Sequence, residues 1–367
     1  MALASAGPTA ADGFDMVKLI RDADHSVKDP GGWAADMLTG FADNRIEANR
    51  ENICSAIAII SQESGFVANP AVPGLGKLAE KALAEKLGAV PILGARILAY
   101  LETVPEANSS FSDHIRAART ERDLDLIYRA MLAYAAGRTE TGFIVNSGLL
   151  NRYIEDRNDV STIGSMQVSV AFALEDAGKE RWTTMSLQDV YALRDDLYTR
   201  KGGMKYGILQ LLGYDTGYDK KIYRFADYNA GRYASRNAAF QSVIAKLSGE
   251  NLSLDGDFLA YARPGKALAK VTNSESALRF AIKKLQLPLT DKQVRTDLLK
   301  EKSVDFASTR TFTALREAYA SATGKQPPFA MVPEITLESV KIRTQMTTAI
   351  FAERVTARYQ RCMAVKG

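Results

Sequence analysis

The stretch ICSAIAIISQESGF, residues 53–66, decides the fold class predicted for this chain. Ile53, Ile57 and Ile60 recur at positions i, i+4 and i+7, which is the spacing of one face of an α-helix. Gly65 follows and suits the left-handed position that commonly ends a helix. The stretch therefore predicts an apolar helix whose last turn carries polar side chains.

The same periodicity continues outward from this helix. Leu124, Ile127, Met131 and Tyr134 repeat nearly the same spacing. We expect further helices over residues 77–88, 92–103, 121–136, 167–178, 186–200, 203–213, 219–228, 235–248, 275–286, 290–301, 308–322 and 335–362. Alternating strand patterns are not convincing, and GFIV at 142–145 is the best candidate for a short extended segment. The sequence predicts an all-α fold.

Glycine and proline mark the breaks between these helices. The segments 69–76 and 324–328 are expected to be loops, and the pattern loosens again over 248–256. We expect an N-terminal segment over 1–44, a main helical domain over 45–250 and a C-terminal helical extension over 251–367.

Composition narrows the classes of function. The 47 basic and 43 acidic residues are interspersed, and a net charge of +4 is too small to indicate nucleic-acid binding. No run approaches the roughly 18 apolar residues of a membrane-spanning helix. Only two histidines are present, which disfavours multi-histidine zinc sites and nucleophiles that depend on a histidine base. An enzymatic function would therefore depend on carboxylates.

The chain has two cysteines, Cys54 and Cys362. They are compatible with one disulfide in an oxidising compartment, and equally with two buried thiols. The first residues lack a basic and then apolar leader, which is compatible with a mature form from which a leader was removed.

Glu63 lies in the last turn of the predicted helix, before Ser64. The negative end of the helix dipole disfavours ionisation of an acid there. Cleavage of a glycosidic bond needs such a protonated acid, which donates its proton to the leaving oxygen. The alternative is a solvated glutamate at a helix end, which is the usual environment of a charged residue.

Two later segments carry polar groups next to glycine. In TIGSMQV, residues 162–168, Gly164 permits a close backbone approach and Gln167 offers an amide that both donates and accepts hydrogen bonds. In FADYNAG, residues 225–231, Tyr228 and Asn229 offer a hydroxyl and an amide. Each segment could equally be structural, as a helix boundary with a core methionine and as a helix C-cap.

Together and in chain order, the three segments resemble the signature of the lytic transglycosylase catalytic domain, in the lysozyme-like superfamily that includes goose-type lysozymes. That family carries Glu-Ser, then Gly-Leu-Met-Gln, then Ala-Tyr-Asn-Ala-Gly. This chain has ES at 63–64, GSMQ at 164–167 and DYNAG at 227–231. The layout is also similar to that of a set of uncharacterised bacterial lipoproteins.

The resemblance covers roughly 45–250, with departures. Ser165 replaces the usual leucine and Asp227 the usual alanine, which puts the substrate contacts in doubt more than the reaction. The gap between the first two motifs is longer than usual, so we expect an inserted helical segment at about 77–140 that could narrow a glycan groove. The tail beyond 250 has no counterpart.

What the resemblance implies is a peptidoglycan lytic transglycosylase with a lysozyme-like fold. Glu63 would protonate the bond between N-acetylmuramic acid and N-acetylglucosamine, and then accept the proton of the C6 hydroxyl to give a 1,6-anhydromuramyl end. The residues implied in substrate binding are Ser64, Gly164, Ser165, Met166, Gln167, Tyr228 and Asn229. No metal or cofactor is implied. The partner would be peptidoglycan glycan strands in the periplasm, with possible anchoring to the outer membrane through a removed lipoprotein leader.

Three other functions stay open. A lysozyme-type hydrolase that inverts would need a second carboxylate to activate water, and Glu140, Asp159 and Asp227 are the candidates, although each could be a surface or capping acid. A catalytically inactive peptidoglycan-binding scaffold would keep the fold without turnover, against which the intact Glu63 argues. A purely helical interaction protein could use the partly apolar face of 335–362, which is more often core than interface.

Overall fold

The structure is a computed structural model, which describes residues 13–89, 91–106, 108–137, 158–178, 185–263, 266–337 and 346–366. Helices dominate it, and its strands are two or three residues long and pair in antiparallel two-stranded ribbons. The all-α prediction is confirmed. The possible extended segment at 142–145 and the candidate Glu140 lie outside the described residues.

The chain forms two compact units. The first unit comprises residues 1–49, 63–208 and 339–343, and the second comprises 50–62, 209–338 and 344–367. This division does not follow the predicted boundaries at 44 and 250, because the chain enters each unit more than once. The inserted segment at 77–140 belongs to the first unit, and the end of the chain returns to the same unit as residues 50–62.

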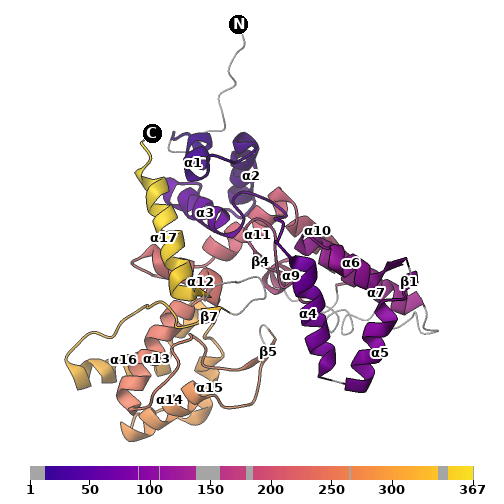
Figure 1. Ribbon diagram of the computed structural model, residues 1–367. Coiled ribbons are helices and arrows are strands. Elements are labelled where there is room, and N and C mark those ends of the chain that lie inside the picture. Colours follow the sequence, from indigo (N-terminus) through magenta and orange to yellow (C-terminus); the bar gives the residue numbers. More distant parts are fainter. Residues whose placement is uncertain are drawn as a thin grey trace. The chain divides into compact units, whose positions relative to one another are not determined.

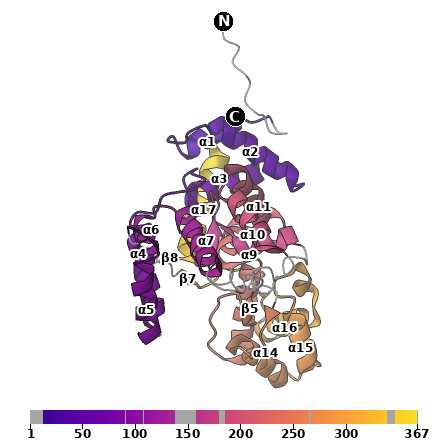
Figure 2. The same ribbon diagram turned by 90° about the vertical axis from the view of Figure 1, so that its right-hand side faces the viewer.

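The first unit contains helices and two short ribbons. Its helices are α1 (Met16–Ala23), α2 (Pro30–Asp43), α4 (Leu75–Gly88), α5 (Pro91–Leu101), α6 (Phe111–Ala117), α7 (Glu121–Gly137), α9 (Val170–Gly178), α10 (Leu187–Leu197) and most of α11 (Arg200–Leu212). Its strands are β1 (Pro105–Glu106) paired with β2 (Ser109–Ser110), and β3 (Thr162–Ile163) paired with β4 (Val168–Ser169). Figure 1 shows α4 and α5 side by side as a helical hairpin, and in Figure 2, turned by 90°, the two helices overlap.

The second unit is built around α12 and α13. Its helices are α3 (Arg50–Glu63) up to Gln62, α12 (Lys221–Ala230), α13 (Ala234–Ser248), α14 (Asn273–Lys284), α15 (Asp291–Leu298), the 3-10 helix η3 (Val304–Ser308), α16 (Arg310–Thr323) and α17 (Thr348–Ala364). Its ribbons join β5 (Tyr261–Arg263) to β6 (Lys266–Ala267), and β7 (Thr336–Leu337) to β8 (Met346–Thr347). In Figure 1, the yellow α17 runs beside α12, while α14, α15 and α16 gather around α13.

An aromatic cluster forms the core of the second unit. Phe240 on α13 packs against Phe258, Phe306 and Phe312, with ring centroids 4.6–5.6 Å apart. All four side chains are buried. Burial of such large rings dominates the hydrophobic free energy of a domain. The region beyond residue 250 therefore completes the core that α13 begins.

Most of the predicted helices are confirmed within a few residues. The largest difference is at the end of the chain, where α17 begins at Thr348 and not near 335. Thr347 accepts a hydrogen bond from the backbone N–H of Ile350 and so caps the helix start. Residues Thr336–Leu337 before it form β7. The apolar periodicity predicted one helix over 335–362, but the capping Thr347 makes the helix begin at Thr348.

The two cysteines are bonded to each other. Cys54 on α3 and Cys362 on α17 are joined by a disulfide with a Cα–Cα distance of 5.6 Å. Arg358 also donates to the Ser61 hydroxyl, at 3.3 Å. The last helix of the chain is thus attached to the helix that leads to Glu63.

Candidate functional site

Glu63 is the last residue of α3, and its side chain is half-buried. The eight residues from Ile53 to Ile60 are all buried, so the helix is held in the core before its final turn. Gly65 and Phe66 then both adopt positive φ, at 58° and 61°. A bulky residue such as phenylalanine rarely takes this conformation, and such backbone strain gathers at functional sites.

Packing holds the Phe66 ring in the first unit. The ring is 5% exposed and makes an edge contact with Trp33 of α2, at a centroid distance of 5.4 Å. Arg200 lies over the other ring of this pair, 5.5 Å from the Trp33 centroid, and forms ion pairs with Asp29 and Asp36. The turn after Glu63 is therefore fixed by aromatic packing, and the direction in which the chain leaves Glu63 is set.

Gly164 to Gln167 form the turn of the β3–β4 hairpin. The backbone N–H of Gln167 donates to the Gly164 carbonyl at 3.0 Å, and both residues have positive φ, 83° at Gly164 and 51° at Gln167. A Cβ at Gly164 would lie 2.2 Å from the carbonyl oxygen of Leu197. Glycine is therefore required here for two independent reasons.

Ser165 and Met166, which the resemblance implies in substrate binding, are packed inside the first unit. Both side chains are fully buried, and a Cβ added at Gly207 of α11 would lie 2.3 Å from the Met166 sulfur. A buried side chain packed this closely against a helix is not available to a glycan. In this structure the two side chains pack the turn against α11, and the buried Ser165 hydroxyl has no hydrogen-bond partner in the part of the chain that the structure describes.

Gly164→Ala is expected to destabilise the first unit by about 1–3 kcal/mol, because it adds both left-handed strain and a clash with Leu197. Gly88→Ala is the control, since Gly88 ends α4, has no positive φ and has open space around it. Urea unfolding should give a lower midpoint for the first variant and an unchanged or higher midpoint for the second. Equal midpoints for both variants would contradict the requirement for glycine in this turn.

The amide of Gln167 is held by three hydrogen bonds. Its Oε1 accepts from the Thr162 hydroxyl at 2.9 Å, and its Nε2 donates to the Gly164 carbonyl at 3.3 Å and to Glu121 Oε2 at 3.2 Å. These bonds fix the orientation of an amide that has little freedom left to turn toward a ligand. Gln167 is thus a rigid part of the turn.

Glu121 was not among the residues that the motifs indicated. It is the first residue of α7, is 4% exposed, and holds the Gln167 amide. Acidic residues in a first helical turn are usually solvated and stabilise the helix dipole, so nothing in the local pattern marks Glu121 as buried. Only the long-range contact to Gln167 identifies it.

A second carboxylate on the same face of α7 holds the segment that precedes β3. Asp125 is fully buried and accepts hydrogen bonds from Arg194 at 2.8 Å, from Asn158 at 2.8 Å and from Arg129. Arg194, also fully buried, donates to the Val160 carbonyl at 2.8 Å. Buried charges must be paired in this way. The predicted insertion is therefore structural, because its helix α7 fastens the segment that leads into β3.

Asp227 on α12 is a buried carboxylate that accepts hydrogen bonds from four donors. Ser235 N–H donates to its Oδ1 at 2.6 Å, and Oδ2 accepts from Tyr233 N–H at 2.9 Å and from the hydroxyls of Tyr218 at 2.8 Å and Tyr214 at 3.4 Å. Burial raises the pKa of this carboxyl above its ordinary value. Because its oxygens are occupied and 1% of the residue is exposed, the geometry favours a structural role.

Tyr228 and Asn229 occupy the last turn of α12, and Tyr228 is 7% exposed. The Asn229 Oδ1 accepts from the Thr348 hydroxyl at 2.9 Å, where α17 begins. Phe225 on the same helix packs against Tyr359 of α17, with ring centroids 5.7 Å apart. Asn229 and Phe225 thus join α12 to the C-terminal helix.

The other candidate second carboxylate, Asp159, is exposed and forms an ion pair with Lys86 of α4. Among the described residues, no cluster of three or more His, Cys, Asp or Glu side chains could hold a metal ion. No helix in that part of the chain is long and apolar enough to cross a membrane.

The candidate residues divide between the units. Glu63, Ser64 and the hairpin turn at 164–167 belong to the first unit, and Tyr228 and Asn229 belong to the second. That the three motifs act on one substrate stays a prediction from the resemblance.

Comparison with known proteins identifies a family. The chain is 36% identical over 354 residues to "Uncharacterized protein YaiW" of Escherichia coli (strain K12), an alignment that covers 95% of this chain and 90% of that protein. No solved structure matches significantly. A family model described as "Protein of unknown function (DUF1615)" matches residues 26–365, and the chain therefore belongs to the DUF1615 family.

Proposed function

We propose that this protein is a peptidoglycan lytic transglycosylase in which Glu63 is the single acid and base. The observation that carries the proposal is the setting of Glu63, a half-buried carboxylate at the end of a buried helix, followed by two consecutive residues with positive φ. A proton-transferring side chain needs this kind of fixed position, because small displacements of a catalytic group cost orders of magnitude in rate.

The proposed reaction moves one proton and needs no water. Glu63 donates its proton to the glycosidic oxygen of N-acetylglucosamine while the acetamido oxygen of N-acetylmuramic acid attacks C1. The Glu63 carboxylate then takes the proton of the C6 hydroxyl, whose oxygen attacks C1 and releases the acetamido group. The product is a 1,6-anhydro ring, and Glu63 ends protonated as it began.

The rigid turn at 164–167, which belongs to the same unit as Glu63, also supports this function. The bonds to Glu121 and Thr162 orient the Gln167 amide, and the burial of Ser165 and Met166 holds the turn against α11. Sites built on such immobile supports position a substrate better than mobile loops do. Contact between this segment and the substrate stays a prediction from the resemblance.

A hydrolase is less well supported at two of its three predicted water-activating carboxylates, Asp227 and Asp159, and the third, Glu140, lies outside the described residues. Asp227 is buried with its oxygens accepting hydrogen bonds, and Asp159 is exposed and paired with Lys86. Glu121 is buried and holds Gln167. Single-residue acid–base chemistry requires none of them.

The disulfide supports a location outside the cytosol. A bond between Cys54 and Cys362 persists in an oxidising compartment such as the bacterial periplasm, where peptidoglycan lies. We propose a periplasmic protein that is anchored to the outer membrane.

The test is digestion of purified sacculi in water enriched in ¹⁸O, with the soluble products identified by mass. A transglycosylase should give muropeptides that end in 1,6-anhydromuramic acid and carry no ¹⁸O. Reducing ends that carry one ¹⁸O would replace the proposal with a hydrolase. Binding to sacculi with no soluble product would indicate a scaffold, and no binding at all would favour a helical interaction protein.

A further inference from the structure

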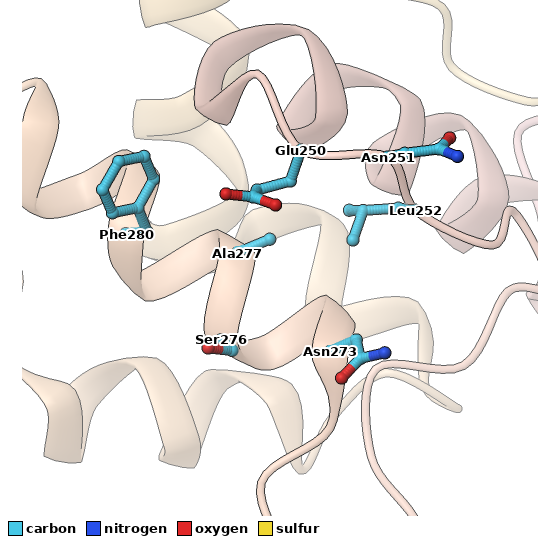
Figure 3. Close-up of a pocket in the computed structure, with 7 residues that line it drawn as sticks. All are labelled: Glu250, Asn251, Leu252, Asn273, Ser276, Ala277 and Phe280. Atoms are coloured by element: carbon cyan, nitrogen blue, oxygen red, sulfur yellow. The ribbon is translucent and has the colours of Figure 1, made fainter.

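A pocket of about 430 Å³ lies in the second unit, far along the chain from Glu63. One wall is the loop after α13, with Glu250 and Leu252, and the other is α14. Figure 3 shows Glu250 reaching over Ala277 toward the ring of Phe280. The residues of α14 that line the pocket are Asn273, Ser276, Ala277 and Phe280.

These four residues share one face of α14, because they are spaced at i, i+3, i+4 and i+7. Leu278 and Ile282 on another face are buried in the core. Phe280 is 49% exposed, so its ring does not serve that core. An exposed aromatic ring surrounded by polar groups is typical of a recognition surface.

The polar side chains of the pocket are free to bind a ligand. Those of Glu250, Asn273 and Ser276 make no hydrogen bond or ion pair to the part of the chain that the structure describes. They offer a carboxylate, an amide and a hydroxyl, which together accept and donate hydrogen bonds.

The two walls are fixed to each other. Lys284, near the end of α14, donates from Nζ to the carbonyls of Leu247 and Ser248 in the last turn of α13, at 3.1 and 3.2 Å. Gly249 then ends α13 in the left-handed conformation, with φ 86°, and directs Glu250 into the pocket. A preformed pocket lowers the entropic cost of binding.

We infer that this pocket binds a pyranose ring of a glycan. The apolar face of the sugar would lie on Phe280, and its hydroxyl groups would bond to Glu250, Asn273 and Ser276. The lining contains no cationic side chain, so an anionic ligand such as a phosphate is disfavoured by Glu250. The polar lining also disfavours a lipid tail. This site goes beyond the proposed function and does not require Glu63 to be catalytic.

Titration of the full-length protein with the tetramer of β-1,4-linked N-acetylglucosamine tests the inference, with heat of binding and saturation-transfer NMR as readouts. The Glu63→Gln protein is used throughout, so that the probe is not consumed. Binding should weaken at least about tenfold in Phe280→Ala and in Asn273→Ala. Leu299→Ala is the matched control, because Leu299 is also an exposed apolar side chain of the second unit, 57% exposed, and does not line the pocket.

Three outcomes decide the matter. Loss or at least tenfold weakening of one binding event in the two pocket variants, with retention in Leu299→Ala, supports the site, and any binding at the proposed active site stays unchanged. Unchanged binding in the pocket variants, or no binding of the tetramer to any protein, overturns it. The tetramer of β-1,4-linked glucose then separates recognition of any pyranose from recognition of the N-acetyl group, and both results support the inferred ligand class. Digestion of sacculi by the wild type is a separate readout, so the proposed reaction and this pocket fail independently.

Discussion

Glu63→Gln is expected to lower the rate of glycan-strand cleavage by about 10²- to 10⁴-fold, which is the usual contribution of a general acid and base. The amide has nearly the size of the carboxylic acid but has no proton of suitable acidity to give to the glycosidic oxygen. It also has no carboxylate with which to take the proton of the C6 hydroxyl. Both halves of the proposed reaction are therefore lost in one substitution.

The measurement is the release of anhydromuropeptides from sacculi by equal concentrations of wild type and variant. Glu85→Gln is the matched control, because Glu85 also lies in the first unit but has a side chain that is 67% exposed, beside Lys81. The control should digest sacculi at the wild-type rate. Both variants should unfold at the wild-type midpoint, so a loss of activity is not a loss of fold.

A Glu63→Gln protein that retains wild-type activity would end the proposal that Glu63 shuttles the proton. Retention of sacculus binding without cleavage is the expected behaviour, since the contacts to the glycan remain. Such a variant would trap the substrate, and cross-linking would then test whether Gln167 and Tyr228 each contact it.

Helices could be predicted from sequence where the apolar pattern is long enough to show its period. Ile53, Ile57 and Ile60 are all buried on α3, as their spacing predicts. The pattern fails for α6, which has seven residues and is held by a capping box between Ser110 and Asp113. A helix this short offers too few turns for periodicity to be detected.

The α2 helix was missed for a different reason. It begins Pro30-Gly-Gly and is capped by Asp29 in the left-handed conformation, with φ 56°. Glycine and proline in series usually indicate a loop. Burial of Trp33 and Phe41 in the first unit compensates for the poor helix propensity of the first turn. Such tertiary compensation is not visible in a local window.

The sequence predicted the conformational role of the glycines in the candidate site. It did not predict the buried carboxylates that hold the β3–β4 hairpin in place. Gly65 has the left-handed φ predicted for it, and the backbone of Gly164 lies close to the Leu197 carbonyl, as a glycine there permits. The residues that hold the hairpin, Glu121 and Asp125, come from a segment that appeared to be an insertion. Their function depends on pairing with residues more than 30 positions away, and a single sequence carries no signal for such pairing.

The disulfide between Cys54 and Cys362 is expected to stabilise the second unit by about 2–5 kcal/mol, the usual range for a native disulfide. The bond joins residues 308 positions apart, so its removal releases a very long loop in the unfolded chain. Both cysteines are buried, at 0% and 3% exposure, so alanine at both positions leaves little strain and no unpaired thiol.

Removal of the disulfide is expected to loosen α17 more than the other helices. This helix packs on α12 through Phe225 and Tyr359, and its first residue, Thr348, donates to Asn229. In the double variant Cys54→Ala/Cys362→Ala, amide hydrogen exchange should rise in α17 and in the last turn of α12, which carries Tyr228. The urea midpoint should fall, and reductant should lower the midpoint of the wild type but leave that of the variant unchanged.

A wild-type midpoint that does not respond to reductant, with unchanged exchange in α17, would show that packing alone holds the last helix. The opposite result connects the disulfide to the proposed site, because a loosened α17 no longer holds the Asn229 amide at the end of α12. Sacculus digestion by the double variant should then decrease at temperatures where its α3 remains helical. Oxidation at Cys54 and Cys362 would therefore support the Tyr228–Asn229 motif by fixing the helix against which α12 packs.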